Sequence, residues 1–136
     1  MITLHIAKLL EQEGFGTLDQ DIHWEKLPID TTGIFIVSRG GTSFRNQRAT
    51  QSFDIYSREV NDLLGADKLE KIWEFVTKDG GGIVCDLPIV PNVSHKQYQR
   101  VRIIPESNLD NIGEDESGRK IWRWSYTVNY VKEIGE

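Results

Sequence analysis

The sequence predicts an α+β fold, in which a mixed, mainly antiparallel sheet of four to six strands carries two packed helices. Three observations lead to this prediction. The N-terminal segment has apolar residues at helical spacing, a segment in the middle of the chain does too, and most of the remaining chain alternates apolar and polar residues with period two. Since 136 residues is a common length for one domain, we expect a single domain over residues 1–136.

The first element is a helix predicted over residues 2–13. Its apolar residues recur at helical spacing, at Ile2, Ile6, Leu9 and Leu10. Gly14 follows, and glycine suits the left-handed conformation that often ends a helix. We expect one buried face on this helix.

Three strands are expected next. Residues 22–24 alternate in polarity, and residues 33–37 read Gly-Ile-Phe-Ile-Val, apolar on both sides as in a central strand. From Arg48 to Ser57, Ala49, Phe53 and Ile55 alternate with polar residues. This pattern predicts a half-exposed strand with an apolar face toward a core and a polar face toward water.

The second helix is expected to begin after Gly65. Two apolar stripes lie on nearly opposite sides of an unbroken helix, the first formed by Val60, Leu63 and Leu64 and the second by Leu69, Ile72, Trp73 and Val76. Gly65 stands where the phase changes, which predicts a short turn and then a helix from about Ala66 to Thr77. The glycines at 80–82 end this helix because three glycines disfavour helical backbone.

The C-terminal third predicts a β-hairpin. A short strand at residues 83–87 precedes it, and its two strands are residues 99–104 and 121–131, joined by a long polar segment over residues 105–120. One face of the last strand is apolar and aromatic, with Trp122, Trp124, Tyr126, Val128 and Tyr130. We expect this face to pack into the core; the alternative is that it is an exposed surface that binds a partner.

Composition argues against several classes of protein. The net charge of -5 disfavours a broad grip on nucleic acid or an anionic membrane, and no apolar run approaches the ~20 residues that span a bilayer. Cys85 is the only cysteine, so an intramolecular disulfide is excluded, and we expect it to be a small strand residue near the core, in a reducing compartment of synthesis.

Catalytic and cofactor motifs are missing from the sequence. His5, His23 and His95 are far apart and lack metal-ligand spacing, and the glycines at 80–82 lack the Lys-Ser or Lys-Thr of a phosphate loop. No nucleophile elbow occurs, and the carboxylates lie in polar loops. We therefore expect no catalytic residue, metal or cofactor, and we do not expect an enzyme.

Two segments have segregated charge. Between Ser38 and Gln51 the chain carries bases and no acid, at Arg39, Arg45 and Arg48. Between Pro105 and Gly118 it carries acids and no base, at Glu106, Asp110, Glu114, Asp115 and Glu116. These eight residues are our interface candidates, because opposite charges steer docking between subunits. Two alternatives stay open: the segments are solvated loops, or the acidic loop lines a channel and repels DNA.

Several pieces of the chain carry a resemblance to a known family. They are the Ile-Ala-Lys-Leu-Leu-Glu helix ending at Gly14, Leu27-Pro28 before the buried 33–37 strand, the 50–56 strand that leads into a helix, and the closing Trp-Arg-Trp-Ser-Tyr-Thr-Val-Asn-Tyr of residues 122–130. In layout, length and texture, over nearly its whole length, the chain resembles the tail terminator proteins of long-tailed bacteriophages, also called minor capsid or tail completion proteins.

The resemblance implies a homo-hexameric ring that caps the tail tube when elongation stops. Its partners would be the major tail tube protein and a head-completion or neck protein, with DNA passing through the channel without specific binding and with no membrane. The protein would belong to the virion tail or neck and would assemble in the host cytoplasm. A ring subunit needs two complementary edges and no active site.

Three other functions remain alternatives. The first is another neck component, such as a head closure or connector protein. The second is a small cytosolic enzyme whose residues meet only in three dimensions, which predicts a deep pocket with a perturbed titratable group. The third is a nucleic-acid binder that uses arginines, namely Arg39, Arg45, Arg48, Arg100 and Arg102.

Overall fold

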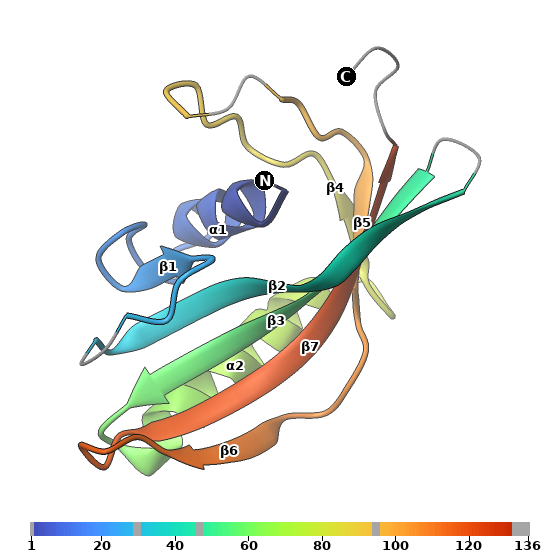
Figure 1. Cartoon of the computed structure of the whole chain (residues 1–136). Coiled ribbons are helices and arrows are strands. Elements are labelled where there is room, and N and C mark those ends of the chain that lie inside the picture. The colour runs from blue at the N-terminus through green and yellow to red at the C-terminus, as the bar shows by residue number, and fades with distance from the viewer. Residues whose placement is uncertain (1, 29–30, 46–47, 94–95, 132–136) are drawn as a thin grey trace.

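The computed structural model of the chain describes residues 2–28, 31–45, 48–93 and 96–131. Within these residues, two helices, α1 (Ile2–Gln12) and α2 (Asp62–Val76), lie against one mostly antiparallel sheet (Figure 1). The sheet has seven strands: β1 (Ile22–Trp24), β2 (Gly33–Arg45), β3 (Arg48–Glu59), β4 (Ile83–Cys85), β5 (Val101–Pro105), β6 (Asp110–Glu114) and β7 (Lys120–Val131). The predicted α+β class is confirmed, but the prediction of four to six strands is too low.

The strand that the sequence analysis missed is β6. It lies in the polar segment predicted to be a connection, and it pairs with the first residues of β7, from Asp110 opposite Arg123 to Glu114 opposite Lys120. Its sequence has no apolar alternation, and Ile112 is 45% exposed. Pairing with a long neighbouring strand therefore forms β6, rather than burial of one of its faces.

The last strand of the chain, β7, lies inside the sheet. The strand order is β1-β2-β3-β7-β5-β4, and β6 also pairs with β7. Along one edge, β7 pairs with β3 from Lys120 opposite Glu59 to Val131 opposite Arg48. Along the other edge, β6 takes the first residues and β5 takes Tyr126 to Asn129. Only β1 and β2 are parallel among the pairs of named strands.

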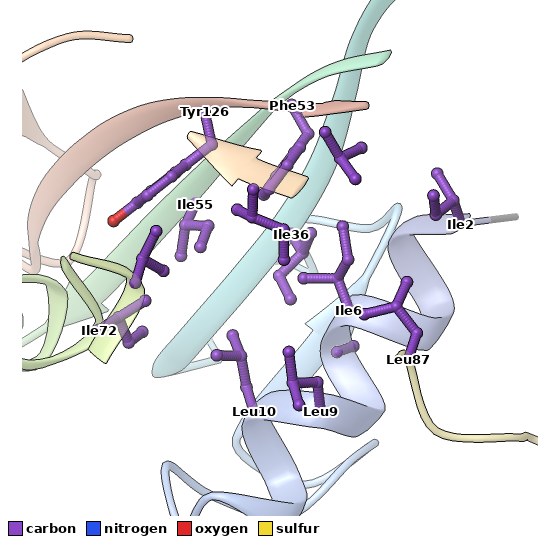
Figure 2. Packing of buried hydrophobic residues seen from close by; sticks show 14 of the residues in the cluster. Ile2, Ile6, Leu9, Leu10, Ile36, Phe53, Ile55, Ile72, Leu87 and Tyr126 are labelled. Carbon is purple, nitrogen blue, oxygen red and sulfur yellow. The ribbon is translucent and has the colours of Figure 1, made fainter. Parts of the chain in front are cut away.

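Both helices cover the same face of the sheet, and one hydrophobic core lies between them and the strands. Figure 2 shows Ile6 of α1 and Ile72 of α2 pointing toward Ile36 and Ile55 of the sheet. Each such side chain stabilises the fold by about 1.5–3 kcal/mol when it is fully buried. The ring contact of Phe15 with Phe75, 5.9 Å between centroids, joins the two helical regions directly.

The predicted N-terminal helix is confirmed to within one residue, but it is buried on more than one face. Its buried residues include Thr3, Leu4 and His5 as well as the predicted stripe. The segment after β4 covers this second side: His5 Nδ1 lies 2.8 Å from the Pro88 carbonyl oxygen, and the His5 ring contacts the Tyr98 ring edge-on at 4.8 Å.

The second helix begins at Asp62, so the predicted turn at Gly65 is wrong. Asn61 is the N-cap, and its side-chain oxygen accepts hydrogen bonds from the amides of Leu63 at 2.9 Å and Leu64 at 3.3 Å. Gly65 is a helical residue whose lack of a side chain allows α2 to approach β3, since a Cβ there would lie 2.7 Å from Ser57 Oγ. The change of phase arises because Val60, Leu63 and Leu64 are exposed rather than buried.

Strand β2 is longer than the predicted 33–37 strand and continues to Arg45, pairing with β3 in a hairpin. Its register shifts between Arg39 and Ser43, where Gly40 has a positive φ of 72°. Glycine adopts this conformation without steric cost, so the strand bends there and resumes pairing. The bend interrupts the polarity pattern, which explains the short prediction.

The aromatic face of β7 packs into the core, as expected. Tyr126 lies opposite Phe53 and Trp124 opposite Ile55, on the side of the sheet that the helices cover. The even positions of β3 face the other way, as its alternation predicts, but this polar face is not open to water along its whole length. Asp54 is only 5% exposed.

Candidate interaction surface

The sheet face opposite the helices and its rim carry four of the eight interface candidates, namely Arg39, Glu106, Asp110 and Asp115. Because side chains alternate between the two faces of a strand, the register assigns them to rows across β2, β3 and β7. We call this the helix-free face and define it by the side chains of Phe35, Arg39, Asp54, Tyr56, Arg58, Arg123, Ser125 and Thr127, with Glu106, Asp110, Asp115 and Arg119, which contact them or one another.

Arg39 and Glu106 meet near the middle of this face. Arg39 Nη2 lies 2.5 Å from Glu106 Oε2, and Arg39 Nε lies 3.8 Å from Asp54 Oδ1. Asp54 Oδ1 also accepts a hydrogen bond of 2.6 Å from the Ser125 hydroxyl, and Thr127 Oγ1 donates to Glu106 Oε1. The buried Asp54 carboxylate is thus satisfied by two neighbouring strands, as a buried charge requires.

Arg123 extends the network toward β6. Its Nη2 lies 3.2 Å from Asp110 Oδ2, and the hydrogen bonds of its guanidinium to Asp110 and Tyr56 raise its pKa above the ordinary arginine value. Tyr56 in turn donates to Asp54 Oδ2 over 3.4 Å. Ion pairs and hydrogen bonds together therefore connect β2 through β3 and β7 to β6.

Asp115 organises the turn between β6 and β7. Its Oδ1 accepts from the amides of Ser117 at 3.0 Å and Arg119 at 2.9 Å, and its Oδ2 lies 3.2 Å from Arg119 Nη1. Desolvation raises the pKa of this carboxyl, but the bonds from Arg119 and Ser117 outweigh it and leave the pKa below its ordinary value. Asp115 is therefore a structural anion that holds the turn closed.

An aromatic and cationic stack lies at the β1 side of the face. The Arg58 guanidinium is 5.1 Å from the Phe35 ring centroid, and the His23 ring stacks on Phe35 at 5.0 Å. Arg58 Nη1 donates to the Pro28 carbonyl, and its Nε lies 3.8 Å from Asp115 Oδ2. The arginine thus connects the sheet to two loops.

The structure brings together some of the eight interface candidates and separates others. Arg39 and Glu106 pair within one chain, whereas Asp110 pairs with Arg123, Glu114 contacts the Lys120 amine, and Asp115 pairs with Arg119. Glu116 is exposed in the β6–β7 turn, and Arg48 is exposed at the start of β3. The Arg45 backbone pairs with Arg48, and its side chain lies outside what the structure describes. Contact across a subunit interface stays a prediction.

Sequence reasoning missed the bases that neutralise the acidic segment. Arg58, Arg119, Lys120 and Arg123 lie outside the segment of residues 105–118, but the β6–β7 pairing brings three of them beside it. A usable signal was present, because Arg123 sits on the polar side of an otherwise aromatic strand. Without β6, nothing in the sequence indicated which acid each base would meet.

Three exposed arginines behave differently. Arg48, Arg100 and Arg102 form no ion pair or side-chain hydrogen bond within the part of the chain that the structure describes. Arg102 lies opposite Asn129, and Arg48 lies opposite Val131, so both are at the end of the sheet where β7 finishes. These guanidiniums keep their full capacity to bind an anion.

The cysteine and the two histidines within the described residues, which could have taken part in catalysis or metal binding, pack against other parts of the fold. Burial, aided by the neighbouring Asp86 carboxylate, raises the pKa of the Cys85 thiol, which disfavours the reactive thiolate. His5 and His23 pack on Tyr98 and Phe35, and His95 lies outside the described residues. In the described ranges, no group of three or more His, Cys, Asp or Glu could hold a metal ion. No helix among them is both long and apolar enough to cross a membrane.

Comparison with known proteins leaves the family open. No family model matches the chain, and no curated protein matches its sequence.

Proposed function

We propose that the chain is a structural subunit of a bacteriophage tail terminator. In this proposal, six copies form a ring that caps the tail tube, stops its elongation and offers the surface to which the head is joined. The partners are other copies of the chain, the tail tube protein and a neck protein, and the site of action is the tail or neck of the virion. The resemblance in element order and sequence texture suggests this function.

The observation that carries the proposal is the helix-free face. It is a sheet surface without a covering helix, and its charged groups are held in fixed positions by strand register and by one another. Such a surface suits contact with another protein, because its side chains are already held in place and lose little conformational entropy on assembly. A deep catalytic site would instead gather titratable groups around a cavity.

The charge pairing on this face also supports passage of DNA without binding. Arg39, Arg58, Arg119 and Arg123 are each engaged by a carboxylate, so a phosphate would have to compete with an intrachain partner. If the part of the face that carries these four arginines lines the channel of the ring, the genome meets paired cations there, whereas Arg48 and Arg102, on the same side of the sheet, have no ionic partner among the described residues. The paired arginines support the channel role of the acidic segment, whereas the DNA-binding alternative would rest on Arg48, Arg100 and Arg102.

The first experiment measures the mass of the purified protein by light scattering over a range of concentrations, with negative-stain images of the same samples. Six-subunit rings, formed alone or on addition of tail tubes of the same phage, are expected. Co-sedimentation with tubes rather than with the portal complex separates a terminator from a head closure protein. A protein that stays monomeric and ignores tubes contradicts the proposal.

A second experiment distinguishes a channel role of the acids from a lateral contact. The double substitution Glu106→Gln with Asp110→Asn neutralises two acids of the helix-free face and is expected to leave the ring mass unchanged and to raise affinity for DNA at low salt, where phosphate contacts are strongest. The matched variant Glu70→Gln and Glu74→Gln changes exposed acids on the outer side of α2 and is expected to change neither property. Loss of the ring in the Glu106→Gln and Asp110→Asn variant would indicate that these two acids form a lateral contact.

A further inference from the structure

The two ends of the long strands differ in chemistry. At the end where β3 begins and β7 finishes lie Arg48, Arg100 and Arg102, with Val131 and Val84, which are 52% and 65% exposed. We call this group the arginine end. Figure 1 shows this end of β3 and β7 at the upper right, opposite the corner where β3 passes into α2.

The opposite end presents exposed aliphatic side chains, with the exposed acid Glu116 nearby. Val60 and Leu63 are 73% and 78% exposed, Leu64 is 43% exposed, and all three lie at the corner between β3 and α2. We call this group the leucine end. The row Glu59, Lys120, Glu114 crosses the sheet directly beside it, and Glu116 follows in the adjoining turn. Glu59 is paired with Lys68 and Glu114 with Lys120, so among these acids the exposed Glu116 carries the remaining negative charge.

Three large aliphatic side chains within five consecutive residues are an unusual surface for a protein that remains alone. They do not serve the fold, because α2 buries Leu69, Ile72 and Val76 on a different side. Exposed apolar groups with a charged rim are the arrangement found at protein interfaces, where the rim supplies orientation and the centre supplies affinity.

We propose that the arginine end of one copy docks on the leucine end of the next copy, so that subunits associate head to tail. The occupant of each end is therefore a second copy of this chain. Charge complementarity selects this pairing: Arg48, Arg100 and Arg102 have no ionic partner among the described residues, Glu116 is exposed beside the leucine end, and both ends carry exposed aliphatic groups. Docking an arginine end on another arginine end would instead place like charges together.

Head-to-tail contact uses two different surfaces and closes into a ring when the rotation between copies allows it. The inference therefore rests on the proposed ring function and assigns its lateral contact. The two ends lie about 35 Å apart along the eleven steps of β3, at about 3.3 Å per residue. That separation leaves the helix-free face between the contacts available for the channel.

The test uses one variant for each end and mixes them. The variant Arg48→Glu with Arg102→Glu removes the arginine end, and the variant Val60→Asp with Leu63→Asp removes the leucine end. All four residues are exposed, so both proteins are expected to fold, which circular dichroism checks. Each variant alone is expected to be monomeric under conditions where the wild type forms rings. Their equimolar mixture is expected to give a dimer and nothing larger, because one intact end of each kind remains.

Matched controls separate a specific contact from altered charge or polarity. Lys71→Glu with Lys78→Glu changes the net charge by the same amount on α2 and just after it, and Ile89→Asp with Val93→Asp changes two exposed aliphatic residues elsewhere. Both controls are expected to form rings like the wild type. If the two end variants also form rings, or if their mixture stays monomeric, the head-to-tail contact is overturned while the ring function stands. A wild type that never assembles, even with tail tubes, overturns both.

Discussion

Charged residues on the helix-free face differ in how much they contribute to the stability of the fold. Asp54 and Asp110 are both paired with arginine, but the Asp54 side chain is 7% exposed and that of Asp110 is 49% exposed. Water screens the outer pair and competes for it, so surface ion pairs typically contribute less than about 1 kcal/mol. Loss of the inner carboxylate leaves the buried Ser125 hydroxyl without its acceptor.

We therefore predict that Asp54→Ala lowers the free energy of unfolding by about 2–3 kcal/mol, whereas Asp110→Ala lowers it by less than about 1 kcal/mol. Urea titration of the two variants measures both values. Because both variants replace an aspartate with alanine, the difference between them reports the position of the carboxylate and not the type of substitution. Equal losses at the two positions would show that burial of Asp54 does not set its contribution.

Tyr126 is buried in the core, and its hydroxyl has no hydrogen-bond partner in the described chain. Desolvation raises the pKa of this phenol above its ordinary value of 10.0. Below pH 10 the group is neutral in both folded and unfolded states and adds no pH dependence. Above pH 10 only the unfolded state loses the proton, so the free energy of unfolding falls by about 1.4 kcal/mol for each pH unit.

Tyr126→Phe removes the unpaired hydroxyl and the ionisation together. We predict that the variant is more stable than wild type by about 1 kcal/mol at neutral pH, and that its advantage grows as the pH rises above 10. Denaturant titrations on both sides of pH 10 measure the difference in the free energy of unfolding between the two proteins. Because both proteins contain the same lysines, the effect of lysine ionisation cancels in this difference. A constant difference across this range would mean that the phenol ionises in the folded state.

At the scale of elements, the docking of α2 on the sheet depends on a missing side chain. Gly65 costs about 1 kcal/mol in helix propensity relative to alanine, yet it lies in the first turns of a helix of fifteen residues. A Cβ at this position would approach Ser57 too closely and would also lie 3.4 Å from Trp122 Cδ1, which explains why alanine does not fit. Asn61 compensates by capping the helix start.

A double-mutant cycle tests the contact between Gly65 and Ser57. Gly65→Ala is predicted to destabilise the protein by about 1–2 kcal/mol despite its better helix propensity, because its Cβ overlaps Ser57 Oγ. Ser57→Ala alone is predicted to be nearly neutral, since that hydroxyl is buried without a partner in the described residues. The double variant is predicted to recover most of the loss, a coupling measurable by urea titration. Additive effects would contradict the proposed contact.

Sequence pattern predicted the elements that bury a face and failed where pairing or exposure decided the structure. The helix at Ile2–Gln12 and the aromatic face of β7 were predictable, because burial fixes their periodicity. β6 was not, because an edge strand held by backbone bonds needs no apolar face. The start of α2 was misplaced because Leu63 is exposed, although leucine is a residue type common in cores.

The candidate surface followed the same rule. Composition indicated two oppositely charged segments, and Arg39 with Glu106 was found in contact. The partners of Asp110 and Asp115 depended on the β6–β7 pairing, which brings residues thirteen and four positions apart side by side. Local charge counts therefore indicate where a surface lies but not which pairs form on it.

At the scale of the whole molecule, one core cluster includes residues from both helices and from the sheet. The central strand β7 contacts β3, β5, β6 and α2. No group of elements has a separate set of buried contacts among those described, so loosening one part exposes the others.

We predict a single cooperative unfolding transition, in keeping with one domain over residues 1–136. Thermal and urea transitions followed by near-UV and far-UV circular dichroism should coincide, and the calorimetric enthalpy should equal the van't Hoff enthalpy. The measurement is made at a concentration where the protein is monomeric, so that association does not contribute. Two separated transitions would divide the chain into independent units.

The position of β7 has a consequence for synthesis. A ribosome releases the chain from its N-terminus, so β3 and β5 emerge before the strand that lies between them. Seventy-two residues separate the end of β3 at Glu59 from Val131 (131 − 59 = 72), which corresponds to roughly 4–14 s at 5–20 residues per second. During that interval the edge of β3 that β7 will occupy is unpaired, and the edge of β5 is unpaired too once Pro105 has been made. The nascent chain therefore depends on prompt completion, or on a chaperone, to avoid pairing with a neighbouring nascent chain.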